Sequence, residues 1–160
     1  MIYNLQAKDK HFIDILGDPF LTSVLMQMLN DPYYRFLPPD VPNYILSYYN
    51  ARSSGEKLDL HIDSVIPVPG DRTWSMQVAF ILEEQTLENG CTIVVPGSHH
   101  SATYTDRSLA RVEPILAGAG DLVMWDSRLW HGTRENVAKR SRWALIATFS
   151  MWWVKQAMNM

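Results

Sequence analysis

The sequence predicts a mainly β protein, an antiparallel sandwich or jelly roll with helices at its N-terminal end. Three observations lead to this fold class. Helical spacing of apolar residues is confined to the first third of the chain, short strand-like segments follow one another after it, and nothing like a crossover helix separates them. Parallel strands need such crossovers, so we expect antiparallel sheets. The 160 residues suggest a single domain over 1–160, with a helical cover in 1–35 and a jelly-roll core in 44–152.

The N-terminal third carries the helical pattern. Asp18 is a typical N-cap residue, Pro19 suits a first helical turn, and Asn30-Asp31-Pro32 would end the helix. Between these signals runs an apolar stripe at helical spacing, made of Phe20, Leu21, Val24, Leu25, Met28 and Leu29. A shorter helix is expected around Asp9–Leu16. We expect both helices to cover one face of a sheet.

Strand-like segments begin at Tyr44 and are separated mostly by glycine, proline, asparagine or serine. We expect about eight strands. They are Tyr44–Ala51, Leu58–Asp63, Trp74–Glu83, Thr92–Val95, Val112–Leu116, Asp121–Trp125, Trp130–Glu135 and Arg142–Trp152. Long loops are expected at Pro67–Thr73 and His99–Arg111.

The two longest of these strands each have a bulky face and a smaller, more polar face. The bulky faces carry Met76, Val78, Phe80 and Leu82 in one strand, and Trp143, Leu145, Phe149 and Met151 in the other. The small faces carry Ser75, Gln77, Ala79 and Ile81, and Arg142, Ala144, Ile146, Thr148 and Ser150. We expect the bulky faces to pack under the helices or between sheets, and the small faces to leave room for a cavity. A face in contact with water would usually carry more lysine and glutamate.

The overall composition narrows the classes of function. The chain is 47% hydrophobic and 19% charged, which fits a folded domain with a real core. Its formal net charge of −3 and the lack of a Lys/Arg run argue against nucleic acid as a partner. The single cysteine, the start without the apolar run of a signal peptide and the lack of a long apolar stretch predict a cytoplasmic protein with no membrane partner. The sequence leaves the oligomeric state open.

A candidate metal site lies in the strand Leu58–Asp63. Alternation along a strand puts His61 and Asp63 on one face, about 7 Å apart along the chain. An imidazole nitrogen and a carboxylate oxygen at this spacing suit Fe(II), Mn(II) or Zn(II), with bonds of about 2 Å. The same alternation also fits an ordinary strand face in water, which Asp59 would share. The pair alone therefore does not decide between the two.

The segment from 120 to 150 adds a second histidine and an arginine. His131 stands in a turn-rich stretch, and Arg142 opens a strongly apolar strand. An arginine there is costly to bury unless an anion meets it, and its planar fork matches a carboxylate. A hairpin would set His131 and Arg142 on neighbouring strands. The alternative is a surface arginine paired with Glu135 or Asp126, which the small residues on the same face of the strand make less favourable.

Together these residues supply two nitrogens and one carboxylate around an ion, with a cation to hold an organic acid, as in non-haem iron oxygenases. At this point the sequence resembles a known family. The stretch from Tyr44 to Ser150 is similar to the phytanoyl-CoA dioxygenase family of iron- and 2-oxoglutarate-dependent oxygenases. The resemblance lies in His61-Ile62-Asp63, "NGCTIVVPGSHH" (Asn89–His100), "GDLVMWDSRLWHG" (Gly120–Gly132) and Arg142.

The resemblance implies a double-stranded β-helix, the cupin-like jelly roll, and a dioxygenase that uses Fe(II), 2-oxoglutarate and O2. Such an enzyme would hydroxylate a C–H bond of a small-molecule substrate and release succinate and CO2. The implied ligands of Fe(II) are His61, Asp63 and His131. For 2-oxoglutarate they are Arg142 at the distal carboxylate, Thr133 with a hydroxyl beside it, and Gln77 or Ala79 along the pocket.

Two departures from the family bear on the function. Members are usually considerably longer, so the substrate pocket here is either open or completed by another chain. Related halogenases replace the carboxylate with a small residue, and the presence of Asp63 favours hydroxylation. Two other functions stay open: a non-catalytic jelly-roll module that binds metal or 2-oxoglutarate, and a metal-dependent isomerase or hydrolase, which would not need Arg142.

Overall fold

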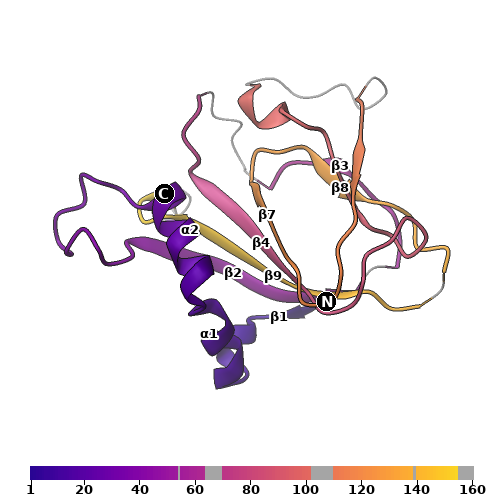
Figure 1. Ribbon diagram of the computed structural model, residues 1–160, viewed down its shortest axis with the longest axis horizontal. Coiled ribbons are helices and arrows are strands. Elements are labelled where there is room, and N and C mark those ends of the chain that lie inside the picture. Colours follow the sequence, from indigo (N-terminus) through magenta and orange to yellow (C-terminus); the bar gives the residue numbers. More distant parts are fainter. Residues whose placement is uncertain (54, 64–69, 102–109, 139, 155–160) are drawn as a thin grey trace.

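The computed structural model describes residues 1–53, 55–63, 70–101, 110–138 and 140–154, and within these ranges it contains nine strands in two antiparallel sheets. In spatial order, the five-stranded sheet consists of β1 (Ile2–Tyr3), β2 (Tyr44–Ser53), β9 (Trp143–Met151), β4 (Ser75–Ile81) and β7 (Leu122–Asp126). The four-stranded sheet consists of β3 (Leu58–His61), β8 (His131–Thr133), β5 (Thr92–Val94) and β6 (Glu113–Ile115). Figure 1 shows β2, β9 and β4 side by side, with β3 and β8 on the other side of the molecule. The mainly β class is confirmed.

All eight expected strands are present, with ends that differ by up to two residues. The sequence analysis missed β1, in which Ile2 pairs with Ala51 and Tyr3 with Asn50. Two residues are too few to show alternation, and this pairing is set by the neighbouring strand instead. The expected loops at Pro67–Thr73 and His99–Arg111 lie partly outside the described residues, and the second begins within a short 3-10 helix, Ser98–His100.

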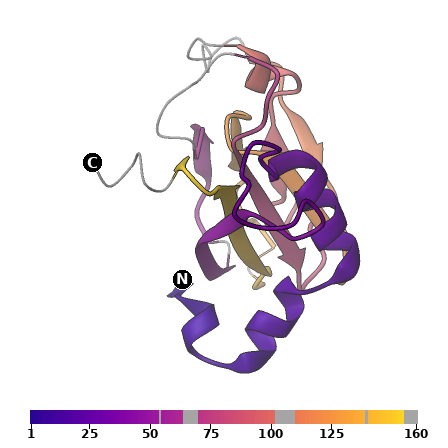
Figure 2. The same ribbon diagram turned by 90° about the vertical axis from the view of Figure 1, so that its left-hand side faces the viewer.

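Two helices precede the strands, α1 (Lys10–Leu16) and α2 (Pro19–Leu29), after the short 3-10 helix Leu5–Ala7. The side chain of Asp18 accepts a hydrogen bond from the backbone N–H of Leu21 at 2.9 Å, as expected of an N-cap. Asp9 caps α1 in the same way. In Figure 2, α2 lies in front of the strands and α1 lies below them. Among the described residues, no single helix is long and apolar enough to cross a membrane. The helices α1 and α2, which are bent by 60° relative to each other, reach the length and apolar composition of a membrane span only when they are taken together.

The apolar stripe of α2 is narrower than predicted. Leu21, Leu25 and Leu29 are buried, whereas Phe20 is 65% exposed and Met28 is 41% exposed. The three leucines are spaced four residues apart and form a single row, and only this row meets the sheet. The predicted stripe of six residues thus includes two, Phe20 and Met28, that lie on the exposed flank of the helix.

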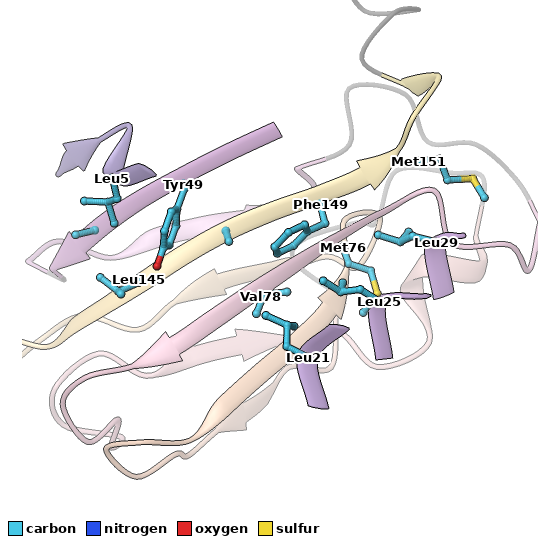
Figure 3. Close-up of a cluster of buried hydrophobic side chains, with 12 residues drawn as sticks. Leu5, Leu21, Leu25, Leu29, Tyr49, Met76, Val78, Leu145, Phe149 and Met151 are labelled. Atoms are coloured by element: carbon cyan, nitrogen blue, oxygen red, sulfur yellow. The ribbon is translucent and has the colours of Figure 1, made fainter. Parts of the chain in front are cut away.

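The main hydrophobic core lies between α2 and the five-stranded sheet (Figure 3). The bulky faces of β4 and β9 supply it, as expected, with Met76, Val78, Leu145, Phe149 and Met151. Burying one leucine of α2 stabilises the fold by about 1.5–3 kcal/mol. Leu82 is an exception to the expected pattern: it is 49% exposed, because β4 ends at Ile81.

The opposite face of the same strands is small and polar. In the register of β4 and β9, Gln77 pairs with Thr148 and Ala79 with Ile146. Paired residues point to the same side of a sheet. These four residues therefore lie on the side away from α2, where small side chains leave space.

The predicted hairpin between His131 and Arg142 is wrong. β8 belongs to the four-stranded sheet and β9 to the five-stranded sheet, so the chain crosses between sheets from residue 133 to 143. β8 is paired with β3 and β5, and β9 with β2 and β4. Each strand thus has both of its edges occupied, which leaves no edge for a hairpin.

Candidate metal centre and adjoining cavity

His61, Asp63 and His131 come together where β3 and β8 pair. His61 ends β3 and stands opposite His131, the first residue of β8, so their ring centroids are 4.3 Å apart. The carboxylate of Asp63 lies between the two rings, with Oδ1 3.6 Å from Nε2 of His61 and Oδ2 3.2 Å from Nε2 of His131. One ligand atom from each of the three residues lies within 4.8 Å of the others.

Backbone carbonyls orient both imidazole rings. Nδ1 of His61 lies 2.8 Å from the carbonyl oxygen of Asp59, and Nδ1 of His131 lies 2.9 Å from that of Leu129. A carbonyl oxygen only accepts, so each Nδ1 carries the hydrogen, and in the neutral ring the lone pair is on Nε2. Two such nitrogens and one carboxylate fit a divalent transition metal, and the carbonyls hold the rings in the required tautomer.

The electrostatics of the cluster keep Asp63 ionised. Burial alone would raise the pKa of Asp63, but when Nε2 of His131 and of His61 also carries a proton, the hydrogen bonds and charges of these rings outweigh burial, so the pKa lies below the ordinary value of 3.8. The pKa of His61 is raised, chiefly by its hydrogen bond to Asp63. The carboxylate is therefore available as a negatively charged ligand at neutral pH.

A turn at residues 126–130 supports two of these three residues. The carbonyl of Ser127 accepts a hydrogen bond from the backbone N–H of Asp63 at 3.0 Å, and the carbonyl of Leu129 receives Nδ1 of His131. Within the turn, the Arg128 guanidinium donates to both carboxylate oxygens of Asp126, at 3.0 and 2.8 Å. Both side chains are buried. The sequence analysis treated this stretch only as part of a motif and missed the ion pair.

A cavity of about 450 Å³ adjoins the cluster and lies between the two sheets, a size typical of small-molecule sites. The small face of the five-stranded sheet lines it with Gln77, Ala79, Ala144, Ile146 and Thr148. The four-stranded sheet and its loops contribute Asp63, His131 and Thr133. The expectation that the small faces leave room for a cavity is confirmed.

Arg142 also lines this cavity and is only 6% exposed, so the alternative of a surface arginine is wrong. Asp126 is bound to Arg128, and in the part of the chain that the structure describes no carboxylate lies within ion-pair distance of Arg142. Its Nε has no hydrogen-bond partner there either. Burial lowers the pKa of Arg142. A buried cation without a carboxylate partner is costly, and a planar guanidinium matches an anion in its geometry.

Thr133 and Gln77, the two remaining predicted residues, both line the cavity but differ in whether they have a hydrogen-bonding group left for a ligand. Oγ1 of Thr133 accepts from the backbone N–H of Leu58 at 3.1 Å, which leaves its own hydrogen to donate. Gln77 is 4% exposed, accepts from Oγ1 of Thr148 at 2.7 Å and donates to Oγ of Ser127 at 3.4 Å. Thr133 can therefore donate to a ligand, whereas the amide of Gln77 is largely engaged by the protein.

The structure adds residues that the sequence analysis did not assign to the site. Trp125 lies against the ring of His131, with centroids 5.3 Å apart. β2 contributes Tyr48, Asn50 and Arg52 to the cavity wall. Their spacing of two residues on a long strand could have revealed a shared face, but only the pairing with β9 shows which way that face points. Gly132 is needed for close approach, because a Cβ there would lie 2.5 Å from the carbonyl oxygen of Leu58.

The family model described as "Phytanoyl-CoA dioxygenase (PhyH)" matches residues 2–144. The chain belongs to the phytanoyl-CoA dioxygenase family. The family predicted from His61, Asp63, His131 and Arg142 is thus confirmed, and the double-stranded β-helix fold with it. The family is named for a dioxygenase, and the donor set of the cluster, two imidazoles and one carboxylate, is in line with that name.

Relatives of this phytanoyl-CoA dioxygenase family member include the dioxygenase af480 of Aspergillus fumigatus, which is 29% identical over 153 residues and covers 92% of this chain. The matched segment covers 47% of the length of that protein, and the chain spans about half the length of the curated relatives it matches. EctD from S. alaskensis with bound Fe has the same fold, with a TM-score of 0.75 at 17% identity over 93% of this chain and 56% of EctD. Iron-bound HygX from Streptomyces hygroscopicus has a TM-score of 0.71 at 18% identity over 94% of this chain and 71% of HygX.

Proposed function

We propose that the protein is an Fe(II)- and 2-oxoglutarate-dependent dioxygenase that hydroxylates a C–H bond of a small-molecule substrate, with release of succinate and CO2. One observation carries the proposal. Ligand atoms of His61, Asp63 and His131 lie within 4.8 Å of one another, and Asp63 and His131 line a cavity that also holds the buried Arg142, for which the described residues offer no carboxylate partner.

Each residue has a distinct part in this proposal. His61, Asp63 and His131 would hold Fe(II) and leave its other positions to ligands. When bound, Fe(II) and 2-oxoglutarate supply the activation of dioxygen that side chains lack. Arg142 binds the distal carboxylate of 2-oxoglutarate through its planar fork, and so directs the keto-acid end toward the metal. Thr133 donates a hydrogen bond to the same carboxylate.

The remaining walls support positioning and exclusion of water. Trp125 packs against His131, and Ala79 and Ile146 give the cavity an apolar side. Gln77 borders the cosubstrate and fixes the hydroxyl of Thr148, and does not bind with a free amide. The proposal also places the activity in the cytoplasm and in a single domain over 1–160, with no nucleic-acid or membrane partner.

Succinate formation tests the proposal without knowledge of the substrate. Protein supplied with Fe(II), 2-oxoglutarate and O2 should form succinate slowly in uncoupled turnover, and His131→Ala should abolish it. His100→Ala is the matched control, because His100 is 57% exposed and pairs with Asp71 outside the cluster. Metal-independent succinate, or none in the wild type, would contradict the proposal.

An anaerobic spectrum separates turnover from binding alone. Fe(II) and 2-oxoglutarate should give the charge-transfer band of bidentate chelation in the wild type but not in His131→Ala. A band without succinate would identify the non-catalytic binding module instead. Metal-dependent activity that survives Arg142→Met would identify a hydrolase or isomerase.

A further inference from the structure

A second arginine faces the cavity from the neighbouring strand. In the register of β2 and β9, Arg52 stands opposite Ala144, and Asn50 stands opposite Ile146. Directly opposed residues share one face of a sheet, and all four line the cavity. Arg142 lies two residues before Ala144 and is therefore a diagonal neighbour of Arg52 on that face.

Arg52 differs from Arg142 in its access to water. Arg142 is buried, whereas Arg52 is exposed at the mouth of the cavity. The pKa of Arg142 is lowered chiefly by burial and, to a smaller extent, by the charge of Arg52.

The other charges at this mouth leave Arg52 without an ion pair. Lys57 is bound to Asp59 at 3.2 Å. Glu56 lines the same rim, but no carboxylate in the described ranges, including that of Glu56, lies within ion-pair distance of Arg52. Within the proposed function, Fe(II) and Arg142 carry three positive charges, and Asp63 and 2-oxoglutarate carry three negative ones. These four groups are therefore neutral together, and the charges that remain at the mouth are those of Arg52 and Glu56, which are not within ion-pair distance of each other.

We infer that Arg52 binds an anionic group of the primary substrate, such as a carboxylate, and that the enzyme therefore acts on acids. This inference rests on the proposed function. The anion fixed at the mouth leaves the apolar remainder of the substrate to lie along Ile146 and Trp125 toward His131. The planar guanidinium of arginine suits this task, and Arg52 has no carboxylate partner among the described residues.

A matched pair of probes tests the charge preference alone. Benzoate and benzamide have nearly the same shape and differ in charge. Both are titrated by calorimetry into wild-type protein loaded with Zn(II) and 2-oxoglutarate, a combination that does not turn over. We expect benzoate to bind at least about tenfold more tightly than benzamide, as one charge-assisted contact allows.

Three variants locate the preference. Arg52→Gln should abolish it, and Glu56→Gln should keep or increase it. Arg111→Gln is the control and should keep it, because Arg111 is exposed, pairs with Glu113 and does not line the cavity. Equal binding of the two probes by the wild type, or an unchanged preference in Arg52→Gln, would overturn the inference.

The titration of 2-oxoglutarate distinguishes this failure from failure of the proposed function. Zn(II)-dependent binding of 2-oxoglutarate that requires His131 and Arg142, without a preference for benzoate, would refute only the inference about Arg52. Loss of 2-oxoglutarate binding in Arg52→Gln would assign Arg52 to the cosubstrate and also overturn it. No binding of 2-oxoglutarate by the wild type would remove the proposed function, and this inference with it.

Discussion

Two arginines that are equally buried, Arg128 and Arg142, have opposite surroundings. Each is 6% exposed. Arg128 donates to Asp126 and to the carbonyl of Gly70, and its pKa is raised, chiefly by the hydrogen bond to Asp126. Arg142 faces the cavity, its Nε meets no acceptor among the described residues, and burial lowers its pKa.

The difference shows which charge the folded chain itself pairs and which charge has no carboxylate partner among the described residues. Removing a charge from water costs several kcal/mol, and a partner must offset this. The folded chain supplies the partner of Arg128, so this ion pair belongs to the structure. The proposed partner of Arg142 is the carboxylate of 2-oxoglutarate. Removing Arg128 should therefore harm stability, and removing Arg142 should harm binding.

The largest effect is expected from Arg128→Met. This change leaves the buried carboxylate of Asp126 without its cation and should lower the free energy of unfolding by about 3–5 kcal/mol, measured by urea denaturation. It should also weaken binding of Zn(II) or Co(II) by about 10- to 100-fold, because the turn that it holds presents Ser127 to Asp63 and Leu129 to His131.

A double variant separates the two roles of the ion pair. The double variant Arg128→Met with Asp126→Asn has no unpaired buried carboxylate and should recover most of the free energy of unfolding that Arg128→Met loses. The turn at residues 126–130 still lacks the ion pair that holds it, so the affinity for metal should stay low. Recovery of both quantities together would show that Arg128 acts on the metal only through global stability.

Arg142→Met should give the opposite pattern, with a smaller effect. Binding of 2-oxoglutarate to Zn(II)-loaded protein, measured by calorimetry, should weaken by about 30- to 150-fold, which corresponds to about 2–3 kcal/mol for a charge-assisted contact. The free energy of unfolding without ligand should stay the same or rise, since a buried charge is lost. A loss of stability as large as that of Arg128→Met would contradict the view that Arg142, unlike Arg128, does not stabilise the fold.

The sequence allowed prediction of one of these arginines and not of the other. Arg142 could be predicted because alternation along a single strand shows small residues on its face. The ion pair of Arg128 could not, because "DSR" looks like any exposed turn. Its burial depends on Gly70, which is far away in the sequence.

The same distinction between local and non-local information holds elsewhere. The ligand pair His61 and Asp63 could be predicted from their spacing of two residues, although β3 ends at His61 and Asp63 lies just beyond it. The hairpin between His131 and Arg142 was wrong because strand pairing depends on which edges other strands already occupy. Arg52 was missed because its face is defined only by its pairing with β9. The roles of these residues in binding metal and cosubstrate stay predictions for the experiments above.

The smallest effect is a dependence on pH that belongs to Asp126. Burial would raise the pKa of Asp126, but the hydrogen bonds and charge of Arg128 outweigh it, so the pKa lies below its ordinary value of 3.8. The stability that this carboxylate contributes is therefore fully present above that value and is lost as the pH falls through the lowered pKa. In Arg128→Met burial acts without Arg128, and the pKa of Asp126 should lie above 3.8.

The deficit of Arg128→Met relative to the wild type should thus be full at pH 7 and shrink on acidification, because the variant gains its proton first. The limiting slope is about 1.4 kcal/mol per pH unit, measured by urea denaturation at intervals from pH 7 to pH 3.5. The variant that also carries Asp126→Asn lacks the titrating carboxyl, so the gap between it and Arg128→Met should close over the same range. If the difference in free energy of unfolding between these two variants did not change with pH, Asp126 would not be an unpaired buried charge in Arg128→Met. The contrast with Arg142 would then rest on packing.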